Sequence, residues 1–258
     1  MAENTPEKLP DDLELLIDLH KNNERQGPGG RSETELALYL TGLDLNAPYR
    51  IADIGCGTGA SSLILAEMLN AKVTSVDFLQ EFLNELNGIA EEVELDDKIT
   101  SCCASMDDLP FESEQFDVIW SEGAIYNIGF EQGLKQWRHF LKQDGVLVAS
   151  EITWTTAERP KELEDYWHAA YPEIDTASNK IKVLERAGYQ LLGYFILPEH
   201  CWIDNYYGPL ERSYDDFLAR HNNSEVAQQL IAAEREEVAL YRKYKDYYSY
   251  GVYVARKL

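Results

Sequence analysis

Apolar positions along the chain follow two periods, one typical of buried strands and the other of amphipathic helices. Short apolar runs at 51–54, 72–78, 99–105, 115–122 and 146–151 predict five strands. Segments at 60–69, 79–91 and 131–142 have apolar residues at helical spacing, and 143–145 would end the last of these helices. Strands that alternate with helices predict a doubly wound, mostly parallel α/β sheet with right-handed crossovers.

The two ends of the chain add helices to this core. Residues 11–23 and 32–43 predict two helices, joined by a loop rich in glycine and proline at 25–30. This loop is either a hinge or a lid over a ligand. Beyond Trp154 we expect helices at 158–170, 179–188 and 210–246, strands at 189–197 and 247–256, and an aromatic loop at 198–207. The last two strands would form a hairpin-like edge, which gives seven strands.

The turn after the first strand carries three glycines on alternate positions, Gly55, Gly57 and Gly59. Glycine permits a sharp turn and a close approach of ligand to backbone. The turn leads to a helix N-terminus, whose unpaired N–H groups favour anions. A nucleotide-type cofactor site is therefore the favoured interpretation. A purely structural turn is the alternative, and the flanking strand and helix argue against it.

Carboxylates lie at the carboxyl ends of the next two strands. Asp77 lies about 20 residues beyond the glycines, where it can accept hydrogen bonds from ribose hydroxyls. Its alternative role is a helix N-cap. In the segment 105–111, Asp107 can accept from an exocyclic amine and Met106 can cover a flat ring. An acidic loop ended by Pro110 is the alternative.

The charge balance limits the partners. The chain of 258 residues has 46 acidic and 23 basic residues, a net charge of −23. Such a surface repels phosphate backbones and anionic lipid, so we expect neither nucleic acid nor membrane as a partner. A solvated acidic surface explains the charge equally well. Residues 1–12 show no signal core, and no apolar run approaches membrane-spanning length.

The cysteines show no metal-ligand spacing, so we predict no metal site. We interpret them as reduced, buried residues of a cytoplasmic protein; they are Cys56, Cys102, Cys103 and Cys201.

Several segments together resemble class I S-adenosylmethionine-dependent methyltransferases. They are the loop at 25–29, the run 51–59, Asp77, the segment 105–111, and the run 120–129. The chain is similar to ubiquinone/menaquinone-type small-molecule methyltransferases and to uncharacterised Bacteroides-type members. The resemblance implies a Rossmann-like fold, S-adenosylmethionine as cofactor, S-adenosylhomocysteine as product, and an activity of class EC 2.1.1.-. It also implies a small-molecule acceptor and a monomer or homodimer.

The resemblance divides the single domain, residues 1–258, into three parts. Residues 1–45 would be a helical lid, 46–154 the cofactor-binding core, and 155–258 the acceptor-side helices and the last two strands. In the core, Asp53 and the glycine turn would hold the methionine portion, and Asp77 the ribose. The implied cofactor-binding residues are Gln26, Gly27, Asp53, Gly55, Cys56, Gly57, Gly59, Asp77, Phe78, Met106, Asp107 and Ser121.

Catalytic residues are not forced by the pattern, because the sulfonium of the cofactor carries the reactivity and a base is needed only for some acceptors. The candidates are Glu122, Tyr126 and His200. Glu122 can instead bond backbone or cofactor amine, Tyr126 can be core, and His200 is more often a packed residue. Glu151 also follows a strand. Acceptor-binding candidates, for an aromatic or quinone-like molecule, are Tyr126, Trp154, Trp202, Tyr206 and Tyr207.

Two other functions remain open. One is a cofactor-binding protein without transferase activity, which would lack an acceptor cavity. The other is a nicotinamide-dependent oxidoreductase, because 55–60 fits a looser dinucleotide pattern. Asp53, placed two residues before the first glycine, and the segment 106–108 argue against it. The helix at 234–245 is either a dimer surface or a solvated face, and we prefer the latter.

Overall fold

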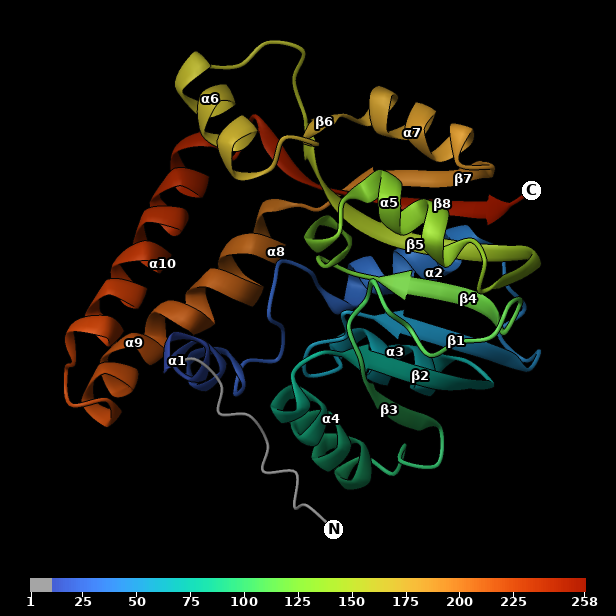
Figure 1. The fold of residues 1–258 in the computed structure, drawn as a ribbon, viewed down its shortest axis with the longest axis horizontal. Helices are drawn as coiled ribbons and strands as arrows, with labels where there is room; N and C mark the ends of the chain where they lie inside the picture. The colour runs from blue at the N-terminus through green and yellow to red at the C-terminus, as the bar shows by residue number, and fades with distance from the viewer. Residues whose placement is uncertain (1–10) are drawn as a thin grey trace.

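The computed structural model describes residues 11–258, so the expectation for residues 1–10 lies outside the described part. Figure 1 shows one twisted sheet flanked by helices. The sheet has the strand order β3-β2-β1-β4-β5-β8-β7, and β6 pairs with β5 outside this path. The strands are β1 (Tyr49–Ile54), β2 (Ala71–Asp77), β3 (Ile99–Cys103), β4 (Phe116–Ser121), β5 (Leu141–Trp154), β6 (Asp175–Thr176), β7 (Tyr189–Ile196) and β8 (Tyr248–Lys257).

This order confirms the expected doubly wound sheet. Strands β1 to β5 are parallel, whereas β8 runs antiparallel to both β5 and β7. The predicted hairpin-like edge is therefore present, and the two-residue β6 is an addition to the seven expected strands. The chain order reverses between β1 and β4, which is where ligands bind in open α/β sheets.

Helices cover both faces of the sheet. Successive strand residues point to opposite faces, so Ile51 belongs to one buried cluster and Ala52 to the other. The first cluster includes residues of α2, α3, α4, α9 and α10, and the second includes residues of α5 and α7. The helices are α1 (Asp11–His20), α2 (Arg31–Thr41), α3 (Ala60–Met68), α4 (Gln80–Glu92), α5 (Phe130–Trp137), α6 (Lys161–Ala170), α7 (Ala177–Arg186), α8 (Glu199–Trp202), α9 (Gly208–Arg220) and α10 (Glu225–Tyr244).

Helices from both ends of the chain gather at one end of the molecule. In Figure 1, α1, α8, α9 and α10 lie beyond the end of the sheet toward which the β4 arrow points. Carboxyl ends of the parallel strands therefore face these helices. Among the helices of the described part, none is both long and apolar enough to cross a membrane.

One boundary in the core differs from the prediction. Helix α5 ends at Trp137, not at 142, and β5 already begins at Leu141. Leu141 is fully buried and aligns with Phe116 of β4, whose N–H donates to the carbonyl of Phe140 at 3.0 Å. Pairing across the sheet thus overrides the helical periodicity of this segment.

The prediction of an aromatic loop at 198–207 is wrong. The segment is helical, with α8 followed by η2 (Ile203–Tyr207), a wider helical turn that leads directly into α9. Its aromatic residues are buried, and the Trp202 ring stacks on Tyr241 of α10 at a centroid distance of 4.4 Å. Packing on α10 and β8 fixes this helix, and those partners lie far away in the sequence.

The cysteine prediction is only partly right. All four thiols are free, as expected. Only Cys201 is buried, however, while Cys103 is exposed. Strand β3 lies at the edge of the sheet, which explains the exposure of this residue.

Candidate cofactor and acceptor site

A cavity of about 460 Å³ lies at the carboxyl ends of β1, β2 and β4. Its wall comes from five segments that follow strands or belong to the N-terminal loop. The lining residues lie within the ranges 25–28, 53–61, 76–82, 104–107 and 122–128, although not every residue of these ranges faces the cavity. The volume falls within the range of about 300–1,000 Å³ that is typical of small-molecule and cofactor sites.

The glycine turn forms one wall, and it is held by its neighbours. Gly55 and Gly57 have φ of +74° and +55°, a region that favours glycine. A Cβ on Gly57 would lie 2.4 Å from the Gln26 Oε1, and one on Gly55 would lie 2.3 Å from the Ala124 Cβ. Side chains of the protein therefore fill the space next to the Cα atoms of both glycines, whereas the sequence predicts that a ligand lies there.

Asp77 connects the end of β2 to this turn. Its Oδ2 accepts from the Gly57 N–H at 2.9 Å, and its Oδ1 accepts from the Leu79 N–H at 3.0 Å, just before α4. The carboxylate is 9% exposed, and burial raises its pKa. Two carboxylate oxygens offer about four acceptor positions, so Asp77 keeps capacity for ribose hydroxyls.

Asp53 is the second carboxylate of the cavity. It is 1% exposed, and its Oδ2 accepts from the Ser62 hydroxyl at 2.6 Å. Burial raises the pKa of Asp53 to about 7, although the Ser62 hydrogen bond opposes this shift. The charge of Arg25 also opposes this shift without offsetting it, so a positively charged ligand group in the cavity would favour the ionised form of Asp53 further.

The N-terminal loop is fastened to the glycine turn by Gln26. The Gln26 Oε1 accepts from the Thr58 N–H at 2.9 Å, and the amide nitrogen donates to the carbonyls of His20 and Asn23. Both ends of the amide are therefore engaged within the chain. Gln26 and Gly27 line the cavity, and the structure gives the Gln26 side chain the role of a clamp.

Glu122 accepts three hydrogen bonds. Its donors are the Arg25 guanidinium at 2.9 Å, the Thr34 hydroxyl at 2.8 Å and the Trp120 indole N–H at 2.8 Å. This arrangement suits a residue that positions the N-terminal loop better than a base. Arg25 was not among the predicted site residues, although it opens the loop at 25–30.

Arg25 also tests whether the cavity fits the expected cofactor. The side chain lines the cavity, and its buried Nε has no hydrogen-bond partner within the described residues. A buried donor without a partner is costly, so a carboxylate in the cavity would satisfy it. The methionine portion of S-adenosylmethionine supplies such a group, and the residues therefore fit the cofactor.

The opposite end of the cavity carries the predicted adenine residues. The Met106 carbonyl accepts from the Trp137 indole at 3.1 Å, and the Ser105 hydroxyl donates to Asp107. Phe78 is 60% exposed at the rim. These contacts hold the loop after β3 against the cavity.

Two of the residues predicted to bind cofactor lie outside this lining. Gly59 packs against Leu86 of α4 and is the last glycine of the turn, with a φ of +87°. Ser121 is fully buried, and its hydroxyl has no partner within the described residues. The other members of the predicted set line the cavity; they are Gln26, Gly27, Asp53, Gly55, Cys56, Gly57, Asp77, Phe78, Met106 and Asp107.

A second cavity, of about 500 Å³, adjoins the first. The two share the lining residues 26–28, Gly123, Tyr126 and Asn127. Nine aromatic side chains line the second cavity: Tyr126, Tyr166, Trp167, Tyr171, Trp202, Tyr206, Tyr207, Tyr248 and Tyr250. Tyr126 thus stands between a cavity built at the strand ends and one built by the later helices.

Glu237 of α10 is the charged residue in the lining of the second cavity. Its Oε1 accepts from the Tyr207 hydroxyl at 2.9 Å. Glu237 is solvent-accessible, and the protein packed around its carboxylate raises the pKa of this group. The sequence analysis predicts a solvated face for this helix, and the position of Glu237 differs from that prediction. Glu237 lies on the same helix face as Tyr241 and Tyr244, because positions four and seven residues apart align on a helix. This spacing could have indicated that the face is buried.

Two predicted or considered candidates, Trp154 and Glu151, lie away from both cavities. Trp154 is 3% exposed and packs under the Arg159 guanidinium. Glu151 is fully buried and forms a 2.6 Å ion pair with Lys180. Neither residue lines either cavity in the described part of the chain, so neither has the position predicted for it.

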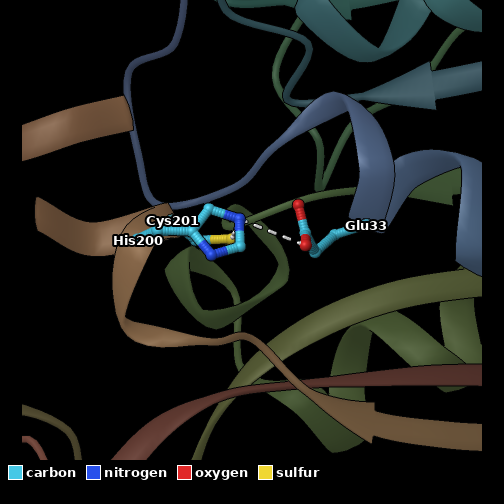
Figure 2. Close-up of side chains that lie close together, drawn as sticks. All are labelled: Glu33, His200 and Cys201. Carbon is cyan, nitrogen blue, oxygen red and sulfur yellow. Dashed lines mark hydrogen bonds and ion pairs between the residues drawn. The ribbon is translucent and has the colours of Figure 1, made fainter. Parts of the chain in front are cut away.

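His200 is also misplaced for a base. Figure 2 shows it beside Glu33, at 3.3 Å, and beside Cys201, at 3.7 Å. The atoms of these three side chains that could coordinate a metal lie within 4.8 Å of one another. The spacing of the three residues along the sequence does not indicate this grouping. Burial and Glu33 raise the pKa of the Cys201 thiol, whereas metals bind the thiolate. We interpret the group as a polar contact that joins α2 to α8.

Comparison with known proteins bears on this site. Residues 51–145 match a family described as "Methyltransferase domain". Over 96 residues the chain is 29% identical to the 27-O-demethylrifamycin SV methyltransferase of Amycolatopsis mediterranei, which covers 37% of this chain and 35% of that protein. The alignment thus spans about a third of this relative.

Solved structures share the fold across nearly the whole chain. A methyltransferase from Geobacter sulfurreducens in complex with S-adenosyl-L-homocysteine aligns with a TM-score of 0.83 and 16% identity, and covers 97% of this chain and 99% of that one. The [4+2]-cyclase SpnF aligns with a TM-score of 0.75 and 19% identity, over 95% and 92%. Residues 51–145 thus match a methyltransferase domain, and nearly the whole chain shares the fold of a solved S-adenosylmethionine-dependent methyltransferase.

Proposed function

We propose that this protein transfers a methyl group from S-adenosylmethionine to a small-molecule acceptor bound in the second cavity. The observation that carries the proposal is the shared wall of the two cavities, at Tyr126, Gly123 and the loop 26–28. Two molecules, one bound in each cavity, would come into contact at this shared wall. Bound cofactor supplies an electrophilic methyl group, and the chain must position the acceptor and exclude water.

The chain's own residues divide this work. Asp77 and Asp107 would accept hydrogen bonds from the ribose and adenine, and the Arg25 Nε would donate to the cofactor carboxylate. Tyr126 would shape the passage between the two cavities. Burial raises the pKa of Tyr126, so its phenol stays neutral and can donate a hydrogen bond.

The proposed acceptor is small because the second cavity is bounded by residues of α6, α8, α10 and β8, with little room for a polymer. The charge of −23 also disfavours nucleic acid. An aromatic or quinone-like acceptor, expected from the sequence, would stack on the tyrosines. A monomer or homodimer in the cytoplasm remains our expectation for the assembled protein.

The test is methyl transfer from tritiated S-adenosylmethionine into a mixture of small metabolites freed of macromolecules. We expect labelled product with the wild type, and at least a tenfold lower rate with Tyr126→Ala, while that variant still binds S-adenosylhomocysteine. Tyr39→Ala is the control, because Tyr39 is 81% exposed and lines neither cavity.

The structural neighbour SpnF, a [4+2]-cyclase, makes the alternative concrete, since the fold alone does not fix the reaction. A protein that binds the cofactor but labels no small molecule in any mixture would support a cofactor-binding role without methyl transfer.

A further inference from the structure

The second cavity has an unusual chemical composition. Half of its lining residues are aromatic, and within the described part of the chain the lining contains one carboxylate, Glu237, and no lysine, arginine or histidine. Three basic residues lie behind the lining or beside it, and each has a carboxylate partner. Arg25 pairs with Glu122, and Lys180 pairs with Glu151. His20, which stacks on the Tyr206 ring and acts on Glu237, lies 3.6 Å from Glu234. The cavity therefore presents ring faces and negative charge to an occupant.

Glu237 retains most of its capacity to bind. The Tyr207 hydroxyl is the one side-chain donor found for it within the described residues. An ionised carboxylate can accept about four hydrogen bonds. Because Glu237 lines the cavity, its remaining acceptor capacity is available to an occupant.

The rings around Glu237 are held in place by one another. The ring centroid of Trp202 lies 5.1 Å from that of Tyr250 and 6.0 Å from that of Tyr207. The ring centroids of Tyr206 and Tyr207 are 5.0 Å apart. Burial raises the pKa of Tyr206, Tyr207 and Tyr250, so these phenols remain neutral. Neutral ring faces attract cations, best when water is excluded.

We propose that the second cavity is an aromatic cage for an aliphatic amine, which Glu237 binds as its ammonium form and which is the methyl acceptor. This inference rests on the proposed function and names the class of its acceptor. A carboxylic acid or a phenolate would instead meet the negative charge of Glu237 and find no cation among the described lining residues.

The chemistry balances with the groups named. The bound ammonium loses its proton to Glu237 or to water, which leaves a lone pair on nitrogen. That lone pair forms the new N–C bond as the methyl carbon separates from sulfur, and the electron pair of the broken bond stays on sulfur. The product is an N-methylated ammonium, and its positive charge lies among the rings that attract cations.

The experiment compares two probes of the same shape. Choline carries a quaternary ammonium that cannot accept another methyl group, and 3,3-dimethylbutan-1-ol is its uncharged counterpart. Both are titrated by calorimetry into protein saturated with S-adenosylhomocysteine. We expect choline to bind at least tenfold more tightly than the alcohol.

Two variants locate the effect. Glu237→Gln keeps an acceptor for Tyr207 but removes the charge, and it should weaken choline binding at least tenfold while the alcohol is unaffected. Glu236→Gln makes the same change one residue earlier, outside the lining of both cavities, and should leave choline binding within twofold.

Equal binding of the two probes would overturn the amine proposal, as would an absence of choline binding with S-adenosylhomocysteine bound. A preference for choline that persists in Glu237→Gln would overturn the role of this residue. Failure to bind S-adenosylhomocysteine would instead count against the proposed function, so the two failures are distinguishable.

Discussion

Arg25 and Glu122 form a 2.9 Å ion pair across 97 residues of sequence, with side chains only 7% and 15% exposed. The pair joins the N-terminal loop to the end of β4, at the wall of the cofactor cavity. Loop and sheet are thus held together by charge at the place where the cofactor would enter.

Removing one partner of this pair should destabilise the protein strongly. Arg25→Met leaves Glu122 with two neutral donors and a largely buried charge, and breaking such a pair costs about 3 kcal/mol or more. Urea denaturation measures the change in the free energy of unfolding. The double variant Arg25→Met/Glu122→Gln should recover much of the loss. Single and double variants with additive losses would show that the two charges do not interact.

The buried pair Glu151–Lys180 offers a second test of the same principle. Lys180→Met should cost about 3–5 kcal/mol, because Glu151 is then buried without a counter-ion. Burial already raises the pKa of Glu151 to about 7 with the lysine present. In Glu151→Gln/Lys180→Met, stability measured by urea denaturation should return toward that of the wild type. A harmless single Lys180→Met substitution would contradict the account.

Cofactor affinity should depend on pH through Asp53. Burial raises its pKa from 3.8 to about 7, so below pH 7 the carboxyl is largely protonated in the free protein. A cationic cofactor favours the carboxylate, and binding near pH 6 should therefore release a proton. Calorimetry in two buffers of different ionisation enthalpy measures this release, and affinity should rise from pH 6 to pH 8. The proton release should be absent in Asp53→Asn; its persistence there would exclude Asp53 as the source.

The same shift affects stability in the opposite direction. An acid whose pKa is raised by folding binds more protons in the folded state between its unfolded value and about pH 7. The contribution of Asp53 to the stability of the free protein therefore falls as the pH rises from about 4 to 7.

The cofactor side of the site could be predicted because its signals are local. The glycine turn, Asp77 and Asp107 each lie at the carboxyl end of a strand or within a few residues of it, and the carboxyl ends of parallel strands meet at one edge of the sheet. Chain order alone then brings these residues together. The fold class followed from the same alternation of strands and helices.

The acceptor side could be predicted only in part. Tyr126, Trp202, Tyr206 and Tyr207 line the second cavity as expected, whereas Trp154 does not, and Glu237 is absent from the predicted set. Glu237 reaches Tyr207 only because α10 packs beside η2, and no short-range pattern indicates that contact. The segment 199–207 is helical, but the sequence predicts a loop there because its aromatic residues do not show a clear helical periodicity. His200 was chosen for its chemistry, whereas its position depends on Glu33, 167 residues earlier in the chain.

The central claim is that S-adenosylmethionine binds at the cavity held by Asp77, and calorimetric titration tests it most directly. We expect micromolar binding to the wild type and at least a tenfold weakening, about 1.4 kcal/mol, in Asp77→Ala. Asp108→Ala is the control, because this exposed carboxylate lies outside the cavity lining. No binding of S-adenosylmethionine to the wild type, together with binding of NADH, would contradict the account.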